Sequence, residues 1–255
     1  MRDRAAGMLA GLVLPLIVLA AWWWATATGR VGPSQLASPQ MVVRELVDLG
    51  QHGILWIDLW ASIERVAIGF GIGFGFAIVL GTIVGLAPLA GRIVDPTLQG
   101  LRAVPSLAWV PLLLLWLGIG EGAKITLIAI GAFFPIYVSL VAGIRHVDRK
   151  LVEVASVLGI RGPRLAIRVV LPAALPSLLV GSRIGLTQGW LFLVAAELLA
   201  ATRGLGFLLT EGQQISRTDE ILCAILLLAV CGKVSESAMR AVEARALAWT
   251  DGLPA

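Results

Sequence analysis

The chain has 255 residues, of which 58% are hydrophobic and 14% are charged, and its mean hydropathy is +0.91. Average soluble domains carry about 25% charged residues, so this composition excludes an ordinary soluble protein and indicates one that crosses a lipid bilayer several times. The net charge of +4 is explained by basic loops beside membrane spans, and we therefore expect no nucleic acid partner.

Long apolar runs predict an all-α membrane protein, because a helix of about 20 apolar residues crosses the hydrocarbon layer. We expect about six transmembrane helices, near 8–27, 63–86, 104–117, 125–144, 176–199 and 221–239. The first run has features of a signal peptide, but its length and the three tryptophans at 22–24 favour a span. Residues 28–62 mix Pro, Gly and charged residues, which predicts a loop with an amphipathic helix lying on the membrane surface.

Six spans place the two termini on the same side of the membrane. The loops on that side include 88–103 and 145–172 and hold twelve Lys and Arg residues, against six on the opposite side. The positive-inside rule therefore predicts cytoplasmic termini and a cytoplasmic loop between spans four and five. We expect residues 1–62 to form a transmembrane helix and an amphipathic extracytoplasmic segment, and residues 63–245 to form the transmembrane domain.

The loop at 145–172 contains the cationic stretch EVASVLGIRGPRLAIRVVLP, which starts at residue 153. Its pattern predicts a helix, a turn and a second helix. Gly159 suits the left-handed position just past a helix end, and Pro163 suits the first turn of the next helix. Two interpretations follow from the local pattern: a docking element with an exposed apolar stripe, or a basic loop that only orients the protein.

The spacing of this stretch resembles the cytoplasmic EAA loop of ABC importer permeases. That motif has Glu-Ala-Ala, three residues, Gly, nine residues, Ile, one residue and Leu-Pro; here Val154 and Val169 replace an Ala and the Ile. In that family the loop is the coupling helix, which sits in a groove of the ATP-hydrolysing subunit. The resemblance implies an ATPase-coupling loop formed by Glu153, Ala155, Gly159, Arg161, Pro163, Leu171 and Pro172.

Residues 100–135 and 190–209 are similar to permeases of the nitrate, sulfonate and taurine group, and the resemblance covers roughly residues 60–250. It implies a permease in a bacterial inner membrane, working as a homodimer and importing a small anion such as a sulfonate, taurine or nitrate. It also implies two kinds of partner: cytoplasmic ABC ATPase subunits and an extracytoplasmic solute-binding protein. Arg203 and Gln188 depart from the usual residues of the group.

The sequence shows no catalytic or cofactor motif, so we expect no enzyme activity and no cofactor in this chain. A P-loop has Gly directly before its Lys and Ser or Thr directly after it. Residues 118–124 resemble this pattern but lack both features, because Ala123 precedes Lys124 and Ile125 follows it. We therefore expect the partner ATPase to bind ATP and Mg. The two histidines lack metal-ligand spacing. The alternative is a secondary transporter driven by an ion gradient, which predicts inverted repeats and paired intramembrane acids. A membrane-embedded enzyme is a second alternative, and it requires a nucleophile–base pair.

Two further groups of residues lie within the expected spans. Small residues recur every four positions and predict a helix-packing face, either within the chain or at a dimer seam: Gly69, Gly73, Ala77, Gly81 and Gly85. Candidates for the pathway or for gating are Arg183, Gln188, Trp190 and Glu197. A charged residue in a span usually faces the bundle interior or water. For Glu197 we consider two roles, lining the pathway and holding the turn at 204–206; for Arg183 we favour an extended side chain at the cytoplasmic edge.

Overall fold

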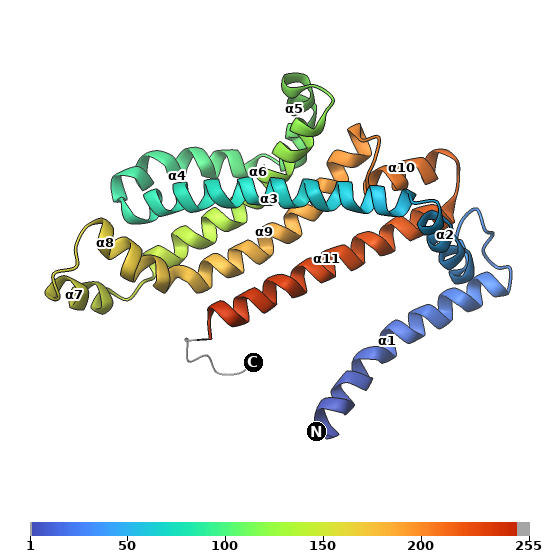
Figure 1. The fold of residues 1–255 in the computed structure, drawn as a ribbon, viewed down its shortest axis with the longest axis horizontal. Coiled ribbons are helices and arrows are strands. Elements are labelled where there is room, and N and C mark those ends of the chain that lie inside the picture. Colours follow the sequence, from blue (N-terminus) through green and yellow to red (C-terminus); the bar gives the residue numbers. More distant parts are fainter. Residues whose placement is uncertain (1, 249–255) are drawn as a thin grey trace.

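The computed structural model describes residues 2–248, which are mostly helical and contain no strand (Figure 1). The first six helical elements are α1 (Arg2–Ala27), α2 (Pro39–Gln51), α3 (Ile54–Leu86), α4 (Pro88–Ala103), the 3-10 helix η1 (Ser106–Trp109) and α5 (Val110–Leu117). They are followed by α6 (Glu121–Arg145), α7 (Arg149–Val157), α8 (Pro163–Leu165), the π-helical turn η2 (Ala166–Val170), α9 (Leu171–Ala200), α10 (Leu205–Gln214) and α11 (Thr218–Ala246).

Within the described residues, four continuous helical segments are long and apolar enough to cross a membrane: α3, α6, the segment Pro163–Leu199, and α11. A fifth crossing is made if α4 and the helical segment Leu107–Leu117 count as one span, bent by 83°. The described apolar part of α1 is Val13–Ala27. The expected all-helical membrane fold is therefore confirmed.

Several expected boundaries are wrong. Residues 88–103 form α4 rather than a cytoplasmic loop, because Pro88 starts a helix well and an amphipathic pattern continues it. The run at 104–117 is not a straight span, since the chain bends there and forms η1 and α5. The second span starts at Ile54 rather than 63, so the expected domain boundary after residue 62 falls inside α3.

The centre of the bundle is made by α3, α6 and α9. Gly69 faces Ile128 and Gly85 faces Ile144, so α3 and α6 run parallel. Helix α9 runs antiparallel to both, because Gly143 packs on Ser177 near its start while Phe192 packs on α6 near its other end. Parallel neighbours require the chain to cross back between them, and the bent pair of α4 and α5 makes that return.

The two ends of the bundle are built from different connections. Helices α7 and α8 connect α6 to α9 at one end, while α10 connects α9 to α11 at the other (Figure 1). The 25 residues of α6 separate these ends by about 37 Å at 1.5 Å per residue. In Figure 1, α1 and α11 both extend from the α10 end toward the α7 end, and α1 diverges from the bundle.

Helix α2 is amphipathic and packs against the start of α11. Its N-cap is Ser38, whose Oγ accepts a hydrogen bond from the N–H of Met41 at 3.3 Å. Glu45 is buried and forms an ion pair with Arg217. Burial raises the pKa of the Glu45 carboxyl, and the charge of Arg217 offsets part of that rise. The expected helix within 28–62 is therefore present, and it joins the end of the bundle that carries α10.

Candidate functional site: the coupling loop and a buried ionic network

The loop at 145–172 starts with a capped helix. Asp148 is the N-cap of α7, and its side chain accepts a hydrogen bond from the N–H of Lys150 at 2.9 Å. This bond satisfies one of the free N–H groups at the helix start. Ala155 is buried, and Val152 packs with the apolar cluster formed by the end of α6 and the start of α9. One face of α7 is thereby fixed to the bundle.

Gly159 ends α7 with a Schellman motif. Its φ is +76°, and its N–H donates to the carbonyl of Ser156 at 3.1 Å. The N–H of Ile160 reaches back to the carbonyl of Ala155 at 2.9 Å, which completes the motif. Gly162 also has a positive φ, of +58°, and Pro163 then starts α8. The predicted backbone positions of Gly159 and Pro163 are confirmed, and two left-handed glycines fix the angle between the helices.

The remaining face of α7 exposes apolar side chains. Val157 is 87% exposed, and Val154 and Leu158 are also exposed. In the same loop Glu153 and Arg161 are exposed as well. Exposed apolar side chains on a short, rigidly connected helix are typical of a surface that docks a partner.

The second half of the loop continues directly into the membrane helix. From Pro163 to Leu199 the chain forms one candidate span of 37 residues, with the π turn η2 near its start. The fifth span was expected at 176–199, and this boundary is wrong because the helical segment already starts at Pro163. The π turn places the N–H of Leu171 on the carbonyl of Ala166, so the helix passes through this region without a break. The end of the loop and the membrane helix α9 therefore form one continuous helical segment.

At the opposite end of the bundle, charged side chains from three helices meet in a buried ionic network. We define it as the side chains of Asp58, Ser62, Arg65, Glu121, Lys124 and Glu197. Five of these six residues are buried, and Glu121 is the exposed one. Burying unpaired charges is costly, so such a group is stable only with close hydrogen bonds between opposite charges.

Arg65 is the centre of this network. Its Nε and Nη2 donate to the two carboxylate oxygens of Glu121 at 2.6 and 2.8 Å, which is a bidentate pair. Its Nη1 donates to Glu197 Oε1 at 2.6 Å and to the carbonyl of Arg203 at 2.7 Å. Lys124 adds a contact of 3.0 Å from Nζ to Glu121 Oε1. Helices α3, α6 and α9 are thus tied together by one guanidinium.

The network also holds the turn between α9 and α10. The N–H groups of Gly204, Leu205 and Gly206 donate to Asp58, Ser62 and Glu197, respectively, at 2.7 to 2.9 Å. Gly204 has a φ of +124°, and a Cβ there would collide with Glu197 and Arg65. Three consecutive backbone donors are therefore satisfied by buried side chains of α3 and α9.

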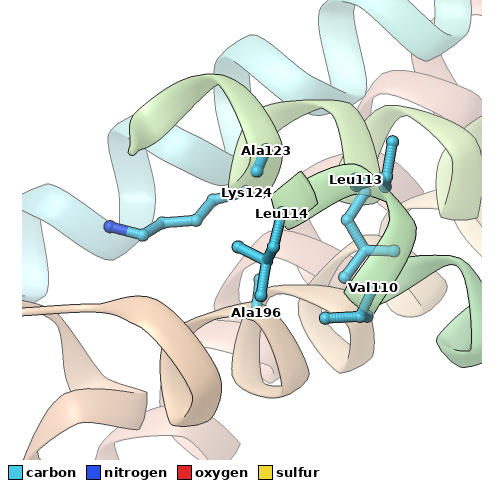
Figure 2. Close-up of a pocket in the computed structure, with 7 residues that line it drawn as sticks. Val110, Leu113, Leu114, Ala123, Lys124 and Ala196 are labelled. Atoms are coloured by element: carbon cyan, nitrogen blue, oxygen red, sulfur yellow. The ribbon is translucent and has the colours of Figure 1, made fainter. Parts of the chain in front are cut away.

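Lys124 combines a packed stem with a charged end. Lys124 is one of the residues that border a cavity of about 10 Å³ between α5, α6 and α9. In Figure 2 its ammonium nitrogen points away from the apolar side chains that line this cavity, among them Leu113, Leu114 and Ala196. The apolar stem is held by packing while the charge reaches the network.

The four pathway or gating candidates do not come together. Glu197 lies in the buried network, whereas Trp190 donates from Nε1 to Ser235 Oγ on α11 at 2.9 Å. Arg183 lies nearer the α7 end and forms an ion pair with Glu243 at 3.4 Å. Gln188 is half-buried on α9 and has no side-chain hydrogen bond within the described residues. Their proposed part in transport stays a prediction.

The small-residue face of α3 packs against α6 of the same chain. A Cβ added at Gly73 would lie 2.5 Å from the carbonyl oxygen of Ala129, and one at Gly81 would lie 3.0 Å from Leu140. Gly69, Ala77 and Gly85 are on the same face, and Gly69 and Ala77 are buried. Of the two arrangements considered from sequence, the structure shows packing within the chain.

Most of the ionic network was not predicted from the sequence. Arg65 and Lys124 were counted among the six basic residues opposite the termini, and Glu121 and Lys124 were considered as part of the incomplete P-loop at 118–124. A signal was present: Asp58, Ser62 and Arg65 recur at helical spacing on one face of an apolar helix.

Comparison with known proteins identifies the family of this chain. The family model of binding-protein-dependent transport system inner membrane components matches residues 73–247. The chain is 40% identical over 243 residues to the putative aliphatic sulfonates transport permease protein SsuC of Bacillus subtilis (strain 168), which covers 95% of this chain and 88% of that protein. It is 39% identical over 240 residues to the taurine transport system permease protein TauC of Escherichia coli (strain K12). This match covers 92% of this chain and 87% of that protein.

A solved structure shares the fold. A chain from the inward-facing conformations of the MetNI methionine ABC transporter matches with a TM-score of 0.64 and 20% identity, over 74% of this chain and 94% of that one. The family model covers more than half of the sequence, and its members are transport components rather than enzymes. The chain therefore belongs to the family of binding-protein-dependent transport system inner membrane components, and it is a permease subunit of an ABC importer.

Proposed function

We propose that two copies of this chain form the membrane pathway of an ATP-driven importer for small organosulfonates, such as taurine and short alkanesulfonates. Two cytoplasmic ATPase subunits bind ATP and Mg and dock on the loop at 145–172. An extracytoplasmic binding protein delivers the substrate at the α10 end. Support for the substrate class comes from the sulfonate and taurine permeases that are 40% and 39% identical to this chain.

The observation that carries this proposal is the construction of the loop. One face of α7 is fixed to the bundle by Ala155 and Val152, and the other exposes Val154, Val157 and Leu158. The loop then continues through Pro163 into the helical segment that ends at Leu199. A partner that pulls on the exposed face moves α9 as a lever, so closure of the ATPases changes the packing of the spans.

The proposal is tested by sulfonate uptake into proteoliposomes that contain this chain, its ATPase and its binding protein. We expect labelled taurine to accumulate with ATP inside, and not with a non-hydrolysable ATP analogue. Uptake driven by an ion gradient without ATP would instead support a secondary transporter. ATP-dependent uptake of nitrate with no uptake of taurine or methanesulfonate would retain the importer and replace the substrate class.

A further inference from the structure

The ionic network contains two buried cations that share one exposed carboxylate. The side chains of Arg65 and Lys124 are 7% and 5% exposed, whereas that of Glu121 is 56% exposed. Glu121 accepts two hydrogen bonds from Arg65 and one from Lys124. Both positive groups are thus directed at one position, which a carboxylate reaches from the solvent side.

The two carboxylates bound to Arg65 are held very differently. Glu197 is 0% exposed, and it also accepts hydrogen bonds from Ser62 Oγ and from the N–H of Gly206. Within the described part of the chain, the carboxylate of Glu121 has no hydrogen-bond partner other than the two cations. It is the first residue of α6, and a Cβ added at Gly120 or at Gly122 would meet nothing within 4 Å. Glu121 therefore has room to rotate into water, while Glu197 is fixed.

We propose that Arg65 and Lys124 form a binding site for the sulfonate group of the substrate, and that the Glu121 carboxylate occupies this site until the substrate displaces it. This inference rests on the proposed import of organosulfonates. A sulfonate has one negative charge and several acceptor oxygens, so it accepts the same hydrogen bonds from the guanidinium and the ammonium. The exchange replaces one anion with another, and the buried cations are never left without a counter-charge.

The surroundings of Lys124, and the position of the site in the bundle, both fit the binding of a sulfonate group. The Lys124 side chain is only 5% exposed, and it extends away from the apolar side chains that line the small cavity (Figure 2). The ammonium has three N–H donors, of which Glu121 uses one in the described structure. The site lies at the end of α6 opposite the loop at 145–172, which is the end that the proposed function assigns to the binding protein.

The test measures binding of radiolabelled methanesulfonate to the complex of this chain with its ATPase in lipid nanodiscs, without the binding protein. Glu121→Gln removes the competing charge, and we expect its Kd to be about tenfold lower than that of the wild type, since hydrogen bonds to a charged group change binding by about this factor. Lys124→Met keeps the packed stem and is expected to raise the Kd about tenfold. Glu236→Gln removes a carboxylate on α11 and serves as the control, with no change expected.

Equal Kd values for the wild type, Glu121→Gln and Lys124→Met would overturn the inference, as would absence of binding in all three. If Glu121→Gln does not assemble with the ATPase, Lys124→Met decides the question alone, because Arg65 keeps both of its carboxylates in that variant. Nitrate and the neutral dimethyl sulfone are measured in parallel. If the wild type and the two variants show the predicted order of Kd values for nitrate but not for methanesulfonate, the site is retained and the sulfonate substrate is rejected. If the Kd values of the wild type and the two variants are equal while ATP still drives taurine uptake, the site is rejected and the proposed function is retained.

Discussion

Arg65 on α3 and Glu197 on α9 are separated by 132 positions in sequence, yet their side chains form an ion pair of 2.6 Å inside the bundle. The carboxylate of Glu197 also binds the N–H of Gly206 and the hydroxyl of Ser62. One buried acid thereby joins two membrane helices to the turn that starts α10. This geometry favours a structural role for Glu197, since its oxygens are directed at protein groups.

Replacing Glu197 with Gln is expected to destabilise the protein by about 3–5 kcal/mol, because removing one partner of a buried ion pair leaves the other charge uncompensated. The measurement is the thermal unfolding of the purified protein in detergent. Glu236→Gln on the surface of α11 is the control and is expected to stay within about 0.5 kcal/mol of the wild type. Equal stability of the two variants would show that the pair of Arg65 and Glu197 contributes nothing.

The close approach of α3 and α6 depends on Gly73. In Gly73→Ala the new methyl would lie 2.5 Å from the carbonyl oxygen of Ala129, so the helices must separate, at a cost of about 1–3 kcal/mol. Gly71→Ala is the matched control on the same helix, because a Cβ there meets nothing within 4 Å. We expect Gly71→Ala to be neutral or slightly stabilising, since Ala favours helices more than Gly. Unfolding curves of both variants test this, and a loss of stability in Gly71→Ala alone would contradict the packing.

Gly159 is expected to be essential for coupling. Its φ of +76° strongly disfavours a β-branched residue, so Gly159→Val distorts the turn that fixes the end of α7. We expect loss of both taurine uptake and stimulated ATP hydrolysis in proteoliposomes, with the protein still present in the membrane. Gly232→Val on α11 is the control, because a Cβ at that position meets nothing within 4 Å. Normal uptake and normal ATPase stimulation in Gly159→Val would argue strongly against the coupling role.

The local sequence was sufficient to predict the helical membrane fold and the backbone of the loop. Gly159 and Pro163 act through their own φ angles and immediate neighbours, so their positions are readable from the chain. The ionic network was not predictable in this way, because Arg65 is brought to Glu121 and Glu197 only by the packing of three helices. The bend between α4 and α5 was missed for a related reason: an apolar run shows length and composition but not direction.

The proposed function requires the exposed face of α7 to contact an ATPase subunit. A photo-reactive amino acid at Val157, which is 87% exposed, tests it directly in cells that produce the whole transporter. The control position is Ile119, which is 83% exposed and lies next to α6 at the opposite end of the bundle. We expect a covalent adduct with the ATPase from position 157 and none from position 119. An ATPase adduct from position 119, or none from position 157 in an active transporter, would contradict it.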